Sequence, residues 1–321
     1  MRRRQLVGAL LVATSALGYA SGPLLAKSVY ATGTDWLALL AWRFTLAGVL
    51  TWGWLLAVPA GRLALSRMTH RQAAVLIGLG MVFAGSSTTY YAAVQLAPVS
   101  LVALLLYVYP ALVAVGAMRL GQPFEGRRAW VALGIAIVGA ICTLDGIETG
   151  ASPAGVALAV ASPLIYAGYI LLAGRAAGER RPGTPDPEPG TGTADVPPLL
   201  AAALMMLGTW LVLVVLAIAG GERVLPGQIP PAAWPGIAGI AIFATVIALQ
   251  AFYAGVARLG AARTALVSTL EPVFTVSLAV LLLGERLAPV QVLGGGLVVA
   301  AVMLAQTSRA APVEPVVERE A

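Results

Sequence analysis

Ten apolar segments of bilayer-spanning length recur along the chain, separated by joints that are short or rich in Gly and Pro. About 20 apolar residues suffice for a helix to cross a hydrocarbon core about 30 Å thick. Of the 321 residues, 59% are hydrophobic and only 11% are charged, whereas a soluble globular domain carries about 25% charged residues. The pattern predicts an all-α integral membrane protein with ten transmembrane helices. The segments are Leu6–Ala26, Trp36–Val58, Ala73–Gln95, Val99–Met118, Ala129–Leu144, Pro153–Gly174, Pro198–Ala219, Trp234–Val256, Thr264–Leu283 and Ala288–Ala305.

The basic residues sort to one side of these segments. With a cytoplasmic N-terminus, sixteen of them fall on the inner side and three, Lys27, Arg223 and Arg286, on the outer side. Short cytoplasmic loops retain positive charge, so both termini are expected in the cytoplasm. The same sorting explains the net charge of +6 without a nucleic-acid partner. Arg2–Arg4 resemble the charged start of a signal peptide, but the long apolar run and the many later segments favour an uncleaved first helix.

Two charges remain deep inside segments, Arg43 and Glu271. Arg43 lies eight residues past Asp35, and Glu271 lies eight residues past Arg263. At about 1.5 Å per residue, each is about 12 Å from its own side of the membrane, so the two approach the midplane from opposite sides. Intramembrane charges usually face a cavity, a partner or a proton path. At these depths the two side chains can meet, directly or through water, and such a contact would be either a static ion pair that holds two helices or a functional pair.

The two halves of the chain repeat at an offset of 162 residues. Each half contains five segments, and an odd number inserts the second half upside down, which gives two inverted five-helix repeats typical of carriers. The matching positions are Tyr91 with Tyr253, Pro110 with Pro272, and, one residue out of register, Leu120-Gly121-Gln122 with Leu283-Gly284-Glu285. Proline within a helix removes a backbone hydrogen bond and bends the helix, so Pro110 and Pro272 are predicted hinges.

Polar side chains on these segments are the candidates for binding substrate or protons. Thr264, Ser268, Glu271 and Thr275 recur at helical spacing and predict one polar helix face. Such a face lines a cavity, or its hydroxyls bond to another helix or to their own backbone. Tyrosines and an amide are candidate wall groups for an organic solute. The complete candidate set is Glu271, Arg43, Ser268, Thr275, Tyr91, Tyr253, Tyr109 and Gln250, with Pro110 and Pro272 as hinges.

Sequence signatures of catalysis are absent. The chain has no H-E-x-x-H, no G-x-S-x-G and no Walker-type glycine loop. A single histidine, His70, and a single cysteine, Cys142, cannot form a His/Cys metal cluster. We therefore expect no catalytic residue, no metal and no cofactor. The expected partners are a small-molecule substrate and the lipid bilayer, with a homodimer left open.

The repeat divides the chain into two domains. Residues 1–145 form the first five-helix repeat and residues 146–306 the second. Within the second, residues 176–198 contain six prolines and four glycines, which is typical of a flexible loop, here on the cytoplasmic side. Residues 307–321 are expected to be a disordered cytoplasmic tail.

Two stretches resemble the ends of the repeats of EamA-type drug/metabolite transporters. They are YYAAVQLAPVSLVALLLYVYPALVAVGAMRLGQ at Tyr90 to Gln122 and FYAGVARLGAARTALVSTLEPVFTVSLAVLLLGERLAPVQVLGGGL at Phe252 to Leu297. Trp42-Arg43-Phe44 also resembles the family's Arg-Phe on the second helix. The first half departs from the pattern, because Tyr109-Pro110 stands where the second half has Glu271-Pro272, and Leu-Gly-Gln stands where it has Leu-Gly-Glu.

The resemblance implies a ten-helix carrier of the bacterial cytoplasmic membrane. Its substrates would be small organic metabolites such as amino acids, which it would often export by alternating access. A carboxyl in apolar surroundings more readily keeps its proton, so Glu271 is a candidate for proton coupling or substrate contact. Arg43 would pair with it or bind an anionic group. The alternatives are a membrane scaffold or sensor that transports nothing and, less favoured, an integral-membrane enzyme.

Overall fold

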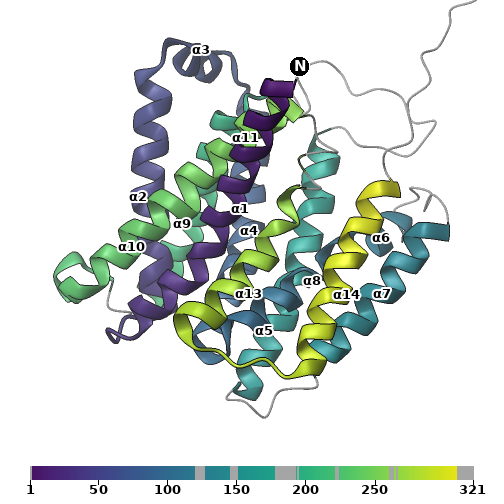
Figure 1. Cartoon of the computed structure of the whole chain (residues 1–321). Helices are drawn as coiled ribbons and strands as arrows, with labels where there is room; N and C mark the ends of the chain where they lie inside the picture. Colours follow the sequence, from purple (N-terminus) through teal and green to yellow (C-terminus); the bar gives the residue numbers. More distant parts are fainter. Residues whose placement is uncertain are drawn as a thin grey trace, which may run out of the picture.

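The computed structural model describes residues 2–119, 127–144, 151–177, 193, 195–220, 224–259, 264 and 267–308, and its regular elements over these residues are helices. The predicted loop and tail lie largely outside this set, as do Leu120-Gly121-Gln122 and Arg263. Figure 1 shows the helices running side by side. They are α1 Arg2–Tyr30, α2 Trp36–Ala57, α3 Pro59–Arg67, α4 His70–Leu96, α5 Val99–Leu106, α6 Tyr109–Arg119, α7 Arg127–Leu144, α8 Pro153–Ala176, α9 Pro198–Gly220, α10 Trp234–Ala241, α11 Ala248–Leu259, α13 Leu270–Leu283 and α14 Pro289–Ser308, with 3-10 turns η1 Pro226–Gln228 and η2 Pro231–Ala233 and the π-helical turn η3 Ile242–Ile247.

Six helical stretches are long and apolar enough to cross a membrane, judged by length and composition. They comprise α1, α2, α4, α8, α9 and the run Pro231–Val256. The remaining predicted segments coincide with shorter apolar helices. The predicted helix over Val99–Met118 is wrong in one respect, because α5 ends at Leu106 and α6 begins at Tyr109. Pro110 explains this break, since its ring clashes with the carbonyl of residue 106 and it donates no backbone hydrogen bond.

Short polar residues fix several helix ends. Asp35 Oδ1 accepts a hydrogen bond from the backbone N–H of Ala38 at the start of α2, at 2.7 Å. Thr69 and Gln72 form a reciprocal capping box at the start of α4. Gly284 follows α13 with φ of 68°, a left-handed conformation that glycine adopts without the cost of a Cβ. These caps satisfy N–H and C=O groups that would otherwise lack partners at helix ends.

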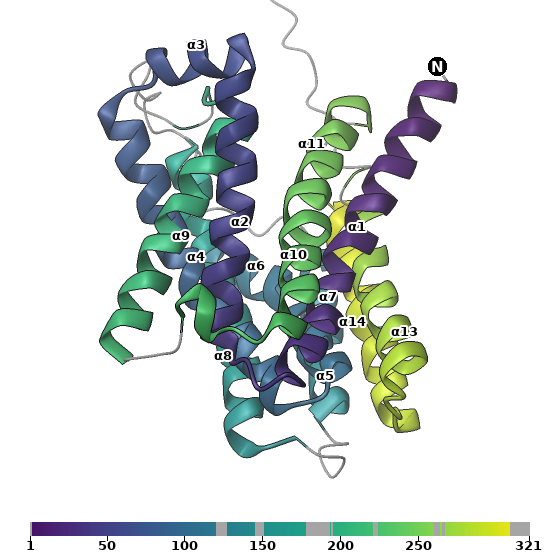
Figure 2. The same cartoon turned by 90° about the vertical axis from the view of Figure 1, so that its left-hand side faces the viewer.

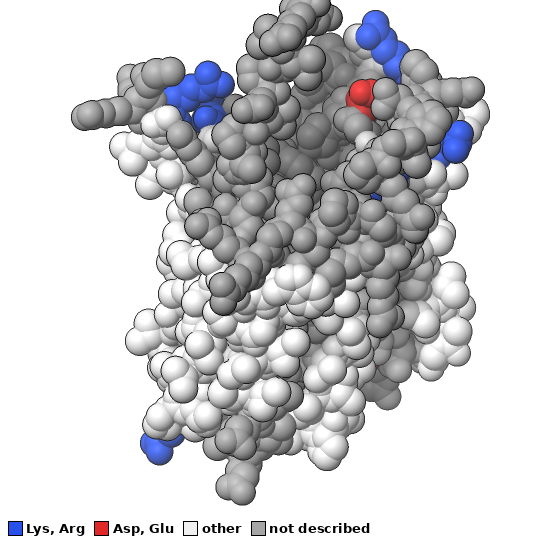
Figure 3. Space-filling view, turned by 90° about the vertical axis from the view of Figure 1, so that its right-hand side faces the viewer, with Lys and Arg blue, Asp and Glu red and all other residues white. Residues whose placement is uncertain are grey.

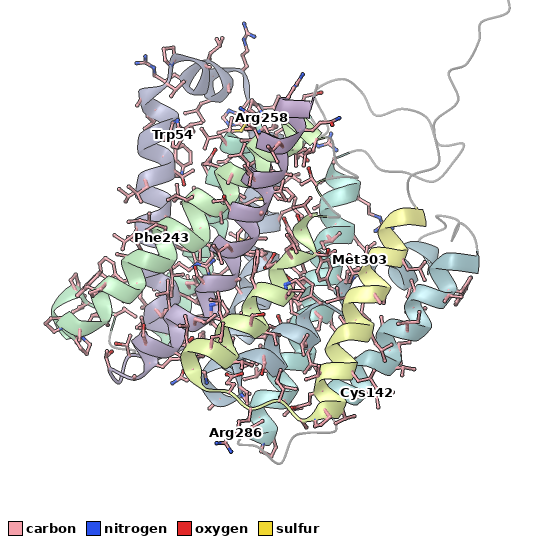
Figure 4. The ribbon with its side chains drawn as sticks, viewed as in Figure 1. Trp54, Cys142, Phe243, Arg258, Arg286 and Met303 are labelled. Carbon is pink, nitrogen blue, oxygen red and sulfur yellow. The ribbon has the colours of Figure 1, made fainter. Side chains whose placement is uncertain are left out.

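Charged side chains gather at the two ends of the molecule. In the face shown in Figure 3, coloured Lys and Arg atoms lie toward the ends, and the described surface between them is mostly white. Figure 4 places Arg258 at the end where the N-terminus lies and Arg286 at the opposite end. Helix α3, with exposed Arg62 and Arg67, lies across the former end (Figure 1). The separation of Arg258 from Arg286 agrees with the sides predicted from the sequence.

The two halves of the sequence do not form separate bundles. Helix α1 of the first half packs against α11 and α13 of the second, and α4 packs against α8 and α9. The last helices of the halves, α7 and α14, also pack together. Figure 2 shows α1, α11 and α13 on one side and α2, α3 and α9 on the other, with the two groups diverging toward the end that carries α3. The two halves therefore interlock.

Close packing of α4 against α9 depends on two glycines. A Cβ atom at Gly80 would overlap the carbonyl oxygen of Met205, and one at Gly208 would overlap the carbonyl oxygen of Ile77. Thr209 Oγ1 donates a 2.8 Å hydrogen bond to the Gly80 carbonyl across the same contact. Small residues at such positions let helix backbones approach closely, which is how helices associate where apolar burial alone gives little.

Glu285 joins the second half to the first at the end opposite α3. Its carboxylate accepts hydrogen bonds from the backbone N–H groups of Val99 at 2.6 Å and Ser100 at 3.0 Å, and so caps α5. Lys27 Nζ donates to the carbonyl of Ala97, just before this cap, at 2.9 Å. The glutamate of Leu-Gly-Glu therefore has a structural role here that the sequence did not indicate.

We predict that Gly80→Ala destabilises the protein by about 1–3 kcal/mol, because the added methyl overfills the α4–α9 contact. Gly78→Ala on the same helix is the matched control, since no atom lies within 4 Å of a Cβ placed there. Thermal unfolding in detergent, followed by size-exclusion chromatography, measures both. Equal stability of the two variants would contradict the close contact.

Candidate functional site

The helices break at corresponding positions in the two halves. In the first half, a turn at Tyr107 and Val108 separates α5 from α6, which begins with Tyr109-Pro110. In the second half, a turn at Thr269 precedes α13, whose first turn contains Glu271-Pro272. Interrupted helices at matching positions of two repeats are the usual framework of a carrier's binding site. The predicted hinge prolines thus lie directly after two helix breaks.

The two breaks meet in space. Helix α5 packs against α13, and the Tyr107 hydroxyl lies within hydrogen-bonding reach of the Glu271 carboxylate. Tyr107 is 8% exposed, so this contact is well shielded. Glu271 stands in the first turn of α13, where free backbone N–H groups and the helix dipole favour a negative charge. The start of α13 and the Tyr107 hydroxyl therefore stabilise the Glu271 carboxyl, which the sequence analysis had singled out.

Aromatic rings extend from this point onto α8. The rings of Tyr109 and Tyr166 are perpendicular, with centroids 4.8 Å apart, and Tyr166 stacks on Tyr169 at 5.6 Å. Phe83 of α4 packs edge-on against Tyr169 at 5.4 Å. Tyr166 is also in electrostatic range of Glu271. Tyr109 therefore belongs to a cluster of tyrosines beside the carboxyl, and its role in binding a solute stays a prediction.

Tyr19 on α1 is a site residue that the sequence reasoning missed. It lies close enough to Glu271, Arg43, Tyr253 and Tyr169 to interact with them electrostatically, so it is near both intramembrane charges. A signal for it exists in the sequence, because the first helices of the halves repeat at an offset of 147 rather than 162. At that offset Gly8, Ser15 and Tyr19 align with Gly155, Ser162 and Tyr166.

Arg43 is held by its own set of partners. Its Nε donates a 3.0 Å hydrogen bond to Thr245 Oγ1 of the π-helical turn. The guanidinium carbon lies 5.0 Å from the Tyr91 ring centroid and 5.2 Å from that of Phe44. Arg43 is 9% exposed. These are its contacts within the described structure, and a direct ion pair with Glu271, which the sequence left open, is not among them.

The remaining sequence candidates take different places. The hydroxyls of Ser268 and Thr275 each donate a 3.0 Å hydrogen bond to the backbone carbonyl four residues earlier. Bonding to the helix's own backbone was one of the two interpretations of this polar face. The turn at Thr269 interrupts the polar stripe expected along one helix. Tyr253 on α11 is half-buried and lies near Tyr19. Gln250 is half-buried on the same helix, and its side chain makes no hydrogen bond to the part of the chain that the structure describes.

Two buried hydroxyls near the tyrosines lack partners among the described residues. They are Ser15 Oγ on α1 and Thr88 Oγ1 on α4. Ser15 precedes Tyr19 by one helical turn, and Thr88 precedes Tyr91 by one turn. A buried polar group without a hydrogen bond costs free energy, so such groups commonly serve an ordered water or a ligand.

Comparison with known proteins agrees with this geometry. The sequence pattern of the EamA-like transporter family matches residues 6–144 and again 153–307. The chain belongs to the EamA-like transporter family. This membership, together with the apolar helices, makes it a multi-pass membrane protein.

This EamA-like chain is similar to other proteins at low sequence identity. It is 24% identical over 228 residues to the uncharacterized transporter sll1319 of Synechocystis sp. (strain ATCC 27184 / PCC 6803 / Kazusa), and the match covers 69% of this chain and 63% of that protein. A protein of known crystal structure matches with a TM-score of 0.62 at 21% identity, over 93% of this chain and 96% of the other. At that identity the likeness shows a shared fold.

We predict that Tyr107→Phe changes the free energy of unfolding by no more than about 1.5 kcal/mol, because the ring stays and one hydrogen bond is lost. Tyr107→Ala should cost about 3–5 kcal/mol, because it opens a cavity at the helix break. Thermal unfolding of the purified protein in detergent compares the two. A loss for the phenylalanine variant as large as that for alanine would show that the hydroxyl, rather than the ring, holds the break.

Proposed function

We propose that this EamA-like protein is a secondary transporter that exports small organic metabolites such as amino acids. The observation that carries this proposal is the meeting of two repeat-related helix breaks at Tyr107 and Glu271. Broken helices are tolerated at membrane depth where protein surrounds them or where they line a watery space. Such breaks are costly for a scaffold and useful for a carrier, since they expose helix ends to a solute.

Alternating access is the mechanism that this architecture favours. We place the ten helices as two inverted five-helix repeats in the cytoplasmic membrane, with both termini in the cytoplasm, on the strength of the basic-residue bias. The divergence of α2 and α9 from α1 and α11 in Figure 2 lies at the end that carries α3. With that end in the cytoplasm, alternating access would open the site in turn toward the end that carries α3 and toward the end that carries Glu285.

The substrate would bind between Arg43 and Glu271. Among the described residues these side chains form no ion pair with each other, and each is held by neutral groups, so neither charge is cancelled by the other. A solute with an anionic and a cationic end would pair with both, and tyrosine rings would cover its apolar part. The partnerless hydroxyls of Ser15 and Thr88 would add hydrogen bonds. Amino acids combine these features in one small molecule.

A flux assay tests the proposal. The full chain is reconstituted into liposomes loaded with a mixture of the standard L-amino acids, and their release is followed by mass spectrometry against protein-free liposomes. Release of one or more compounds is the expected result. No release from this panel or from a wider metabolite panel would overturn transport and favour a scaffold or sensor.

Proton coupling through Glu271 gives a sharper expectation. If one proton exchanges for one solute, each unit of pH gradient supports about tenfold accumulation. Glu271→Gln should abolish this response while the protein still inserts and folds, because the amide cannot release a proton. Asp195→Asn, which neutralises an exposed carboxylate before α9, is the matched control and should respond as the wild type does. Unchanged pH dependence in Glu271→Gln would refute the proton role.

A further inference from the structure

We propose that Thr245 is a positioning residue, which holds the Arg43 guanidinium by its Nε edge and leaves its remaining N–H groups for a carboxylate of the substrate. The role in holding Arg43 stands on geometry alone. The carboxylate rests on the transport function proposed above. Thr245 lies on the π-helical turn of the second half, whereas Arg43 lies on α2 of the first.

The π-helical turn determines how the Thr245 hydroxyl can bond. Its Oγ1 donates a 3.0 Å hydrogen bond to the carbonyl of Ile240, five residues earlier. The single hydroxyl hydrogen is thereby committed, and only the lone pairs of the oxygen remain. Arg43 Nε, which can only donate, supplies the matching partner at 3.0 Å. The π-turn spans Ile242–Ile247, and turns of this kind frequently occur at functional sites.

Burial makes this hydrogen bond effective. Thr245 is 6% exposed and Arg43 is 9% exposed, so water competes poorly for either group. A hydrogen bond from a charged donor in such surroundings is stronger than a neutral one. Phe243 on the same turn is 55% exposed (Figure 4), so the turn presents an apolar ring outward and its hydroxyl inward.

The edge that Thr245 occupies determines what Arg43 can still bind. A guanidinium carries five N–H donors in a planar fork. With Nε taken, the terminal nitrogens remain, and the rings of Tyr91 and Phe44 flank the group. The Tyr91 hydroxyl also lies within hydrogen-bonding reach of the guanidinium and would accept from one of these terminal N–H groups, which leaves the others for a ligand. A planar carboxylate is the anion that this fork matches best.

The other half of the repeat lacks this arrangement. At the offset of 162 residues, Arg43 corresponds to Met205 and Thr245 corresponds to Phe83. The repeat therefore puts an apolar pair at the equivalent place. If the Arg43–Thr245 bond served only to join α2 to its neighbour, apolar side chains could serve that purpose as well. The polar pair in a single half favours a role in recognition.

Labelling of Arg43 tests the positioning directly. Phenylglyoxal, which condenses with guanidinium groups, is applied to the purified full chain, and the labelled peptides are quantified by mass spectrometry. Thr245→Val removes the acceptor at nearly constant volume and should raise the rate of Arg43 labelling several-fold. Thr245→Ser keeps the hydroxyl and should restore the wild-type rate. The exposed Arg258 and Arg286 serve as internal controls and should label equally in every protein.

An unchanged Arg43 rate in Thr245→Val would overturn the positioning role. Thr245→Ala offers the same comparison if the valine variant fails to fold, because it removes the hydroxyl without adding bulk. A change at Arg258 and Arg286 as well would also count against the proposal, since general loosening of the protein would explain it.

Transport kinetics test the carboxylate. For the L-amino acid that the liposome assay identifies, Thr245→Val should raise KM about tenfold with kcat retained, the expected loss for a weakened charged hydrogen bond. The C-terminal amide of the same amino acid should show a smaller change. Equal effects on acid and amide would refute carboxylate recognition. If the wild type carries no amino acid, the proposed substrate fails, while the labelling result still decides the role of Thr245.

Discussion

The need to pair every backbone N–H and C=O group away from water governs this structure. A continuous helix meets that need by itself, so a break in an apolar helix is costly unless protein shields it. Both breaks here are shielded, because Tyr107 is 8% exposed and Thr269 is 5% exposed. They lie at matching positions of the repeat and meet, so each helps to exclude lipid from the other. Tyr107 and Glu271 meet at these two turns.

The two intramembrane charges, Glu271 and Arg43, are each stabilised by a different set of neighbouring groups. Glu271 sits at a helix start beside one phenol, and Arg43 is held by a hydroxyl and two rings. Direct pairing would have stabilised both charges but would have used their binding capacity. Neutral partners instead lower the cost of burial while each charge stays available. This difference separates a site that can take a ligand from an ion pair that only joins helices.

The sequence by itself determined where the apolar helices lie, apart from the break between α5 and α6, and which residues are candidates for the site. Helix positions follow from apolar runs, because spanning a hydrocarbon core requires a fixed length of apolar chain. Glu271, Arg43, Pro110 and Pro272 were recognisable because charge and proline are costly inside apolar helices, so they stand out against a uniform background. Tyr19 was recoverable too, from a second repeat offset that the first alignment did not reveal.

Only the tertiary structure decided which of these residues meet. Counting residues from the helix ends placed Arg43 and Glu271 at similar depths in the membrane. Depth alone, however, does not say which helices are neighbours. The interlocking of the halves put Tyr107 beside Glu271 and Thr245 beside Arg43. Thr245 gave no signal in the sequence, since one threonine in an apolar run is common. Its importance comes from a π-helical turn, which depends on packing rather than on local residue preference.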